Sequence, residues 1–217
     1  MKRKGYAQVE PNHLSAQYTG QIYAQLPAMT VTTTGSGESA VTTISPTEQL
    51  ENGQFLKYNY AAGRAGVDGD GEWLLVYNEE KLYDERRQNH KDFVMKASDM
   101  ADGTIYPRLL KTNVGDIFTT NAFKATSGNA SVAGPDQEIT MADLSLGDYI
   151  TVGEDGWLAK ANSKPASGIC FQVVPHFAQL KDDGTAPTAT YTTTDGVNVY
   201  NYTLADMQDA VKLQRIQ

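Results

Sequence analysis

The segment 68–72, Asp-Gly-Asp-Gly-Glu, comes closest to a metal site, because three acidic residues alternate with glycine. Calcium loops open with acidic residues at alternate positions, and Glu79 falls where such a loop carries its twelfth-position ligand. Trp73, however, occupies the sixth position, where the sharp turn of that loop requires glycine. We therefore predict a solvated hairpin turn between strands at 54–60 and 72–77.

Histidine and cysteine form no local zinc pattern. His13, His90 and His176 are far apart in the sequence, and Cys170 is the only thiol. A ligand set assembled from distant positions is the alternative. Cys170 lies in the apolar run 168–174, which predicts a buried strand residue rather than a reactive thiol, and a single cysteine excludes an intrachain disulfide. We expect no metal.

The carboxylate pairs Glu79-Glu80 and Asp182-Asp183 are adjacent in sequence, so on a strand their side chains would point to opposite faces. A glycosidase needs both carboxyl groups on one substrate. No phosphate loop opens a helix, and no serine lies in a nucleophile elbow. We therefore expect no cofactor and no enzymatic activity, and a hydrolase with a dispersed site is the third hypothesis.

Aromatic side chains supply the candidate partner-binding residues. Tyrosine combines an apolar face with a hydroxyl group and suits partly wet interfaces. Tyr6, Tyr18, Tyr23 and Leu26 lie in a segment without strong core periodicity, and we expect them to anchor this segment on another subunit. The alternative is that they pack on the chain's own body. An exposed aromatic platform could also bind sugar.

The elements that would position these residues fall into three parts. Residues 1–45 are predicted to form an N-terminal arm, and within them 30–45, rich in Thr, Ser and Gly, favour an arm or a long surface loop over a weak hairpin about 35–37. Residues 46–180 are predicted to form a β-rich core domain, and residues 181–217 a C-terminal hairpin and helix.

Short apolar runs separated by turn residues predict the core strands, and they indicate a barrel or sandwich of short antiparallel strands. Residues 79–89 are ambiguous, since they would also fit a helical turn or two. Three strand entries share a glycine, a polar residue and two apolar residues, a pattern typical of a turn that leads into a strand. The predicted strands are 54–60, 73–77, 93–95, 117–118, 149–152 and 169–174, and the three entries are 52–56, 114–118 and 146–150.

Asp195-Gly196 predicts a two-residue hairpin turn between strands at 188–194 and 197–202. Thr203 then resembles a helix cap, and the apolar residues that follow it have helical spacing up to Val211. We therefore predict that a short helix closes the chain.

Charge and hydropathy narrow the classes of partner. The 217-residue chain has 26 acidic and 18 basic residues, a formal charge of −8, and its one basic cluster is 2–4. Nucleic-acid binding needs clustered Lys and Arg, so we expect no nucleic-acid partner. No apolar stretch approaches the roughly 20 residues of a membrane span. Polar residues within 6–14 argue against a signal peptide, so we expect synthesis and folding in a cytoplasm.

The opening segment 6–27, YAQVEPNHLSAQYTGQIYAQLP, and the segment 50–58, LENGQFLKY, resemble small structural proteins of tailed bacteriophages, as do the Gly-Asp strand entries. The resemblance is to head decoration, or capsid cement, proteins. It implies a β-rich body that binds the major capsid protein on the outer surface of the virion and forms homo-oligomers. The alternative is a carbohydrate- or receptor-binding module of a virion fibre or tail.

Overall fold

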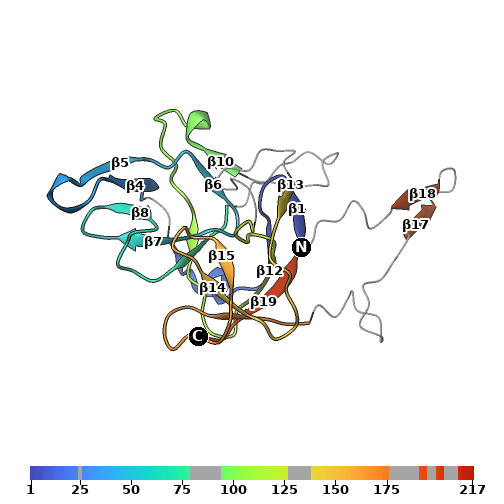
Figure 1. Cartoon of the computed structure of the whole chain (residues 1–217). Helices are drawn as coiled ribbons and strands as arrows, with labels where there is room; N and C mark the ends of the chain where they lie inside the picture. The colour runs from blue at the N-terminus through green and yellow to red at the C-terminus, as the bar shows by residue number, and fades with distance from the viewer. Residues whose placement is uncertain (24–25, 79–93, 127–137, 176–190, 195–198, 203–209) are drawn as a thin grey trace.

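The computed structural model describes residues 1–23, 26–78, 94–126, 138–175, 191–194, 199–202 and 210–217 (Figure 1). Within these ranges the chain is mainly β with antiparallel sheets, which confirms the predicted class. Among the described residues, helix is confined to α1 (Ser15–Thr19) and two 3₁₀ turns, η1 (Gly37–Ser39) and η2 (Ala97–Asp99). None of these described helices has the length and apolar character needed to cross a membrane.

The largest sheet has six strands, and it joins the two ends of the chain. Its order is β15-β14-β16-β19-β12-β2. The strands are β2 (Val9–His13), β12 (Ile117–Thr120), β14 (Tyr149–Val152), β15 (Leu158–Ala161), β16 (Phe171–Val173) and β19 (Val211–Arg215).

A five-stranded sheet has the order β3-β11-β9-β7-β8, and four strand pairs complete the described β-structure. The five strands are β3 (Ile22–Tyr23), β7 (Phe55–Asn59), β8 (Arg64–Gly66), β9 (Leu74–Val76) and β11 (Leu109–Leu110). The pairs are β1 (Lys2–Lys4) with β13 (Glu138–Thr140), β4 (Met29–Thr34) with β5 (Val41–Pro46), β6 (Gln49–Glu51) with β10 (Val94–Lys96), and β17 (Tyr191–Thr194) with β18 (Val199–Tyr202).

The two large sheets share one hydrophobic core. Phe171 of the six-stranded sheet lies 5.6 Å from Phe55 of the five-stranded sheet and 5.3 Å from Phe118, measured between ring centroids. Leu56 and Leu74 point to the opposite face of the five-stranded sheet and belong to a second apolar cluster. Both faces of this sheet are therefore covered. Successive residues of β9 are all buried for this reason, which explains the continuous apolar run around Leu75.

The three predicted strand entries fold into the same turn. The turns span residues 51–54, 113–116 and 145–148. In each turn, the N–H of the fourth residue donates to the carbonyl oxygen of the first, and the fourth side chain accepts from the N–H of the first at 2.7 or 2.8 Å. Gly53, Gly115 and Gly147 occupy the third position with φ of 93°, 98° and 85°. The sequence echo is therefore a repeated turn that requires positive φ.

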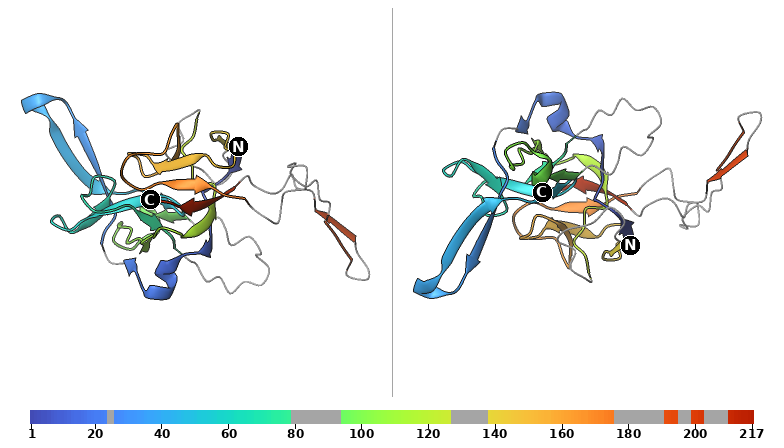
Figure 2. Two further views of the ribbon diagram at one scale, coloured as in Figure 1. Left: turned by 90° about the horizontal axis from the view of Figure 1, so that it is seen from below. Right: turned by 90° about the horizontal axis from the view of Figure 1, so that it is seen from above.

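Residues 1–45 are not an arm separate from the core, so this part of the predicted division is wrong. Strands β1, β2 and β3 pair with β13, β12 and β11 of the body, and Leu14 and Ala28 are fully buried. Residues 29–46 form the hairpin β4–β5. The sequence favours an arm or a long surface loop here, and the hairpin is the alternative. It projects from the body of the molecule, as Figure 1 and both views of Figure 2 show.

The C-terminus also differs from the prediction. Residues 211–215 form strand β19 between β12 and β16, where a closing helix was expected. Alternation of the side chains in this strand buries Leu213 completely, so tertiary pairing overrides a weak helical pattern. Residues 203–209, and the ambiguous segment 79–89, lie outside the described residues.

The predicted C-terminal hairpin is present, with a different register. Thr194 pairs with Val199, so four residues separate the strands instead of two. The predicted Asp195-Gly196 turn itself lies outside the described residues. The six predicted core strands are confirmed, each overlapping a strand of the structure from β7 to β16.

We predict that Gly53→Ala destabilises the fold more than Gly115→Ala. Both substitutions force a side chain into positive φ, which costs about 1–2 kcal/mol. A Cβ at Gly53 would in addition lie 2.4 Å from the Ala122 Cβ, whereas a Cβ at Gly115 meets nothing within 4 Å. Urea denaturation should show an extra loss of about 1–3 kcal/mol for Gly53→Ala. Equal losses would contradict the crowding argument.

Candidate functional site

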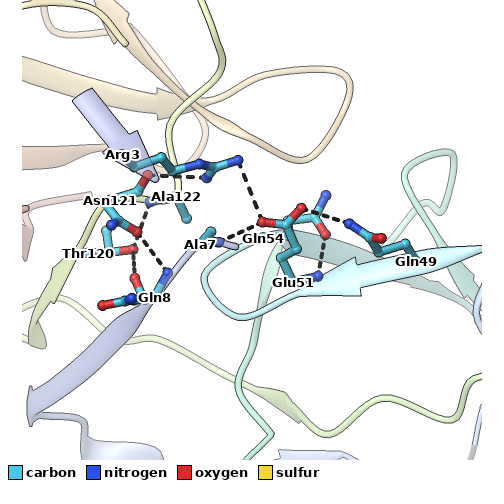
Figure 3. Close-up of polar contacts among 9 residues, drawn as sticks. All are labelled: Arg3, Ala7, Gln8, Gln49, Glu51, Gln54, Thr120, Asn121 and Ala122. Carbon is cyan, nitrogen blue, oxygen red and sulfur yellow. Dashed lines mark hydrogen bonds and ion pairs between the residues drawn. The ribbon is translucent and has the colours of Figure 1, made fainter. Parts of the chain in front are cut away.

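A buried ion pair between Arg3 and Glu51 lies at the centre of the molecule's polar interior (Figure 3). Arg3 is 2% exposed, and its Nη2 lies 3.5 Å from Glu51 Oε2. Its Nη1 donates to the Asn121 carbonyl oxygen at 3.3 Å, and its guanidinium carbon lies 4.7 Å from the centre of the Trp157 ring. Burial lowers the pKa of Arg3, and the charge of Glu51 opposes this effect.

Glu51 uses both carboxylate oxygens within the fold. Oε2 accepts the Ala7 N–H at 2.6 Å, and Oε1 accepts from Gln49 Nε2 at 3.0 Å. The Glu51 N–H donates to Gln54 Oε1 at 2.8 Å. Figure 3 shows these side chains converging from separate segments. The carboxylate therefore joins the N-terminal segment to β6.

Asn121 holds the same N-terminal segment from the other side. The Gln8 N–H donates to Asn121 Oδ1 at 2.7 Å, and Thr120 Oγ1 donates to the Gln8 carbonyl oxygen at 2.6 Å. The Ala122 N–H then donates to Thr120 Oγ1 at 3.0 Å. The cluster therefore positions the entry to β2, and its chemistry is structural.

An open groove of about 660 Å³ lies beside this cluster. Gln49 and Gln54, which bond to Glu51, and Trp157, which contacts Arg3, also belong to the groove wall. Lys124 and Asp155 form an ion pair of 2.8 Å in the wall. Hydroxyl groups of β4 and β5 line another side, so the groove lies at the base of the projecting hairpin.

The hairpin β4–β5 has two unlike faces. Cross-strand partners share a face, and alternate pairs lie on opposite faces. Val31 with Ile44, and Met29 with Pro46, therefore form an apolar face, whereas Thr32 with Thr43 lies on a hydroxyl face. Every residue of β5 is exposed, and Ile44 is 54% exposed. A two-stranded hairpin alone is marginally stable in water.

Two carboxylates of the acidic loop 68–72 are engaged in ion pairs. Arg64 contacts Asp68 through two bonds of 2.7 and 2.6 Å, and Lys111 Nζ lies 2.6 Å from Glu72. The hydrogen bonds from Arg64 lower the pKa of Asp68. No group of three or more His, Cys, Asp or Glu side chains within the described ranges could hold a metal ion.

Three of the four predicted anchor residues belong to the chain's own core. Tyr6 is buried with Lys96 Nζ 5.5 Å from its ring centre, and Tyr23 and Leu26 pack on the second apolar cluster. Tyr18 is 78% exposed beside His13. Partner binding stays a prediction for these residues, and Tyr18 is the most exposed of those described.

The Tyr23 ring packs edge-on against Tyr58, and Tyr58 packs in the same way against Tyr60. Burial, with smaller contributions from Tyr60 and Tyr23, raises the pKa of Tyr58 to about 12. This phenol therefore stays protonated at neutral pH. Tyr60, 73% exposed, presents the surface end of this cluster.

Cys170 is fully buried, as predicted, and burial raises the pKa of its thiol. His13 lies in β2, whereas His90, His176 and the pairs at 79–80 and 182–183 lie outside the described residues. Sequence reasoning missed Arg3 and Glu51, because partners 48 positions apart leave no local signal.

Comparisons of the chain with protein-family models, with curated proteins and with solved structures each find no match. The functional argument therefore depends on the residues and the geometry described above.

We predict that Glu51→Gln destabilises the fold by about 3–5 kcal/mol, because it leaves the buried Arg3 charge uncompensated. Adding Arg3→Met to this variant should remove that charge and recover part of the loss. Denaturation of both single variants and the double variant forms a mutant cycle, with an expected coupling of about 1–3 kcal/mol. Strict additivity would show that the pair is not coupled.

We predict a pH-dependent contribution from Asp68. Its pKa is depressed in the folded state, so the stability that it adds is present above its unfolded pKa of about 3.9 and is lost as pH falls through the folded value. Asp68→Asn should cost about 1 kcal/mol near neutrality, and the difference from the native protein should narrow below about pH 4. Melting at several pH values would measure this, with Asp70→Asn as the matched control.

Proposed function

We propose that the protein is a structural, non-enzymatic component of a tailed-phage virion, which binds the major capsid protein on the outer surface of the head in many copies. The observation that carries this proposal is the projecting hairpin β4–β5, an exposed element with an apolar face. Such an element suits assembly with protein neighbours, because its side chains are not needed by the core.

The interior chemistry favours the same role. Arg3 and Glu51 are paired within the fold, and Asp68 and Glu72 are held by basic side chains. These are the groups that a catalytic or metal-dependent function would leave open. The two large sheets with their shared core also favour a sandwich-like body, a rigid base from which the hairpin projects.

Many copies on a repeated lattice make modest contacts sufficient. Each hairpin offers only a few apolar side chains, and such contacts are individually weak. A second contact made by a molecule that is already attached is effectively intramolecular, so the affinities reinforce one another. Decoration of a capsid therefore fits a small interaction element better than a single high-affinity partner does.

A carbohydrate- or receptor-binding role on a virion fibre or tail is the second candidate, and the groove favours it. Its wall combines hydroxyl and amide side chains with Trp157, a composition that suits a polar ligand with an apolar face. A glycan array with the full chain separates the candidates, since decoration of the head requires no glycan signal.

We predict that the native protein co-sediments with heads of the phage that encodes it, assembled without it. Ile44→Asp should reduce this binding at least tenfold, because a charge enters the apolar face of the hairpin. Leu146→Asp is the matched control, since Leu146 is exposed to a similar extent, at 59%. Native protein that stays in the supernatant would refute the proposed function.

A further inference from the structure

We infer that the open edge of β5 is a self-association surface, where a second copy of this chain adds its own β5 antiparallel to the first. This inference deepens the proposed function and rests on it, since linked copies would bind the head as oligomers. In the described part of the chain, β5 pairs only with β4. All six of its residues are exposed.

The edge of β4 is less open than that of β5. Close to its base, Ala28 forms a parallel bridge with Ala65, and the Ala65 N–H donates to the Pro27 carbonyl oxygen at 2.9 Å. Strand β8 therefore begins to cover this side. Along β5, alternate residues direct their N–H and C=O groups away from β4, and about 20 Å of strand edge is available for pairing.

The two outer edges of the six-stranded sheet are protected against pairing. Edge strand β2 of the six-stranded sheet carries Glu10 and Pro11, and the opposite edge strand β15 carries Lys160. Charge and proline are the usual means of blocking an exposed edge. Strand β5 has no charged residue, and its single proline, Pro46, lies at its end. The contrast with the edges of the six-stranded sheet indicates that the β5 edge is available for pairing.

The hairpin β4–β5 is the part of the surface where charge opposes a second copy least. The chain carries a net charge of −8, so two copies repel one another over most surfaces. Glu38 is the one charged residue in the sequence 29–46. Two hairpins can therefore approach with little charge to desolvate. An antiparallel pair of identical strands has two-fold symmetry, so the edge is its own complement, and Thr43 lies close to the two-fold axis.

The test uses the oligomeric state of the full chain in the absence of heads. Analytical ultracentrifugation of the native protein should show a dimer. Thr43→Lys and Thr43→Glu should each raise the dissociation constant at least tenfold, because like charges meet across the axis. An equimolar mixture of the two variants should restore the dimer. Ser163→Lys, which adds the same charge at another exposed residue, should dimerise like the native protein.

Each outcome decides the inference. A native protein that is monomeric at its highest soluble concentration would overturn it, and so would Thr43 variants that dimerise normally. If the native chain is monomeric and the Thr43 variants lose head binding, the edge pairs with a different protein. If it dimerises through β5 but binds no heads, the proposed function fails and the self-association stands. Circular dichroism melting verifies that each variant is folded.

Discussion

The buried pair of Arg3 and Glu51 is the interaction on which the arrangement of the fold depends. Removing two charges from water is costly, and hydrogen bonds to the charged groups offset part of that cost. Glu51 therefore binds Gln49 and the Ala7 backbone as well as Arg3. This requirement fixes Arg3 in the interior, near β6 and beside Trp157.

Segments near both ends of the chain form strands of the six-stranded sheet. Strand β2 is the outer neighbour of β12, and β19 fills the place between β12 and β16. Without β19, the six-stranded sheet would separate into two parts and expose Phe118 and Phe171. The body therefore forms from segments that are distant in sequence, and long-range pairing rather than local propensity decides its topology.

The hairpin β4–β5 differs from the body of the molecule because it is largely exposed. Its side chains contribute little to the core, it carries almost no charge, and its edge lacks the protection that β2 and β15 possess. Exposed β-structure without protection is a liability in a protein that works alone. In a protein that works in many copies, the same features provide a contact surface, which is why we connect the hairpin with assembly.

The sequence by itself determined the class of the fold, the six core strands, the repeated turns at Gly53, Gly115 and Gly147, and the burial of Cys170. These features follow from neighbouring residues, since alternation and turn chemistry act over a few positions. The sequence did not determine that residues 1–23 belong to the body, or that β19 is a strand. Only the tertiary structure decided these points, because the partners of Arg3, Tyr6 and Leu213 lie far away in the chain. Burial and pairing between distant segments outweigh the weak local preferences that the sequence displays.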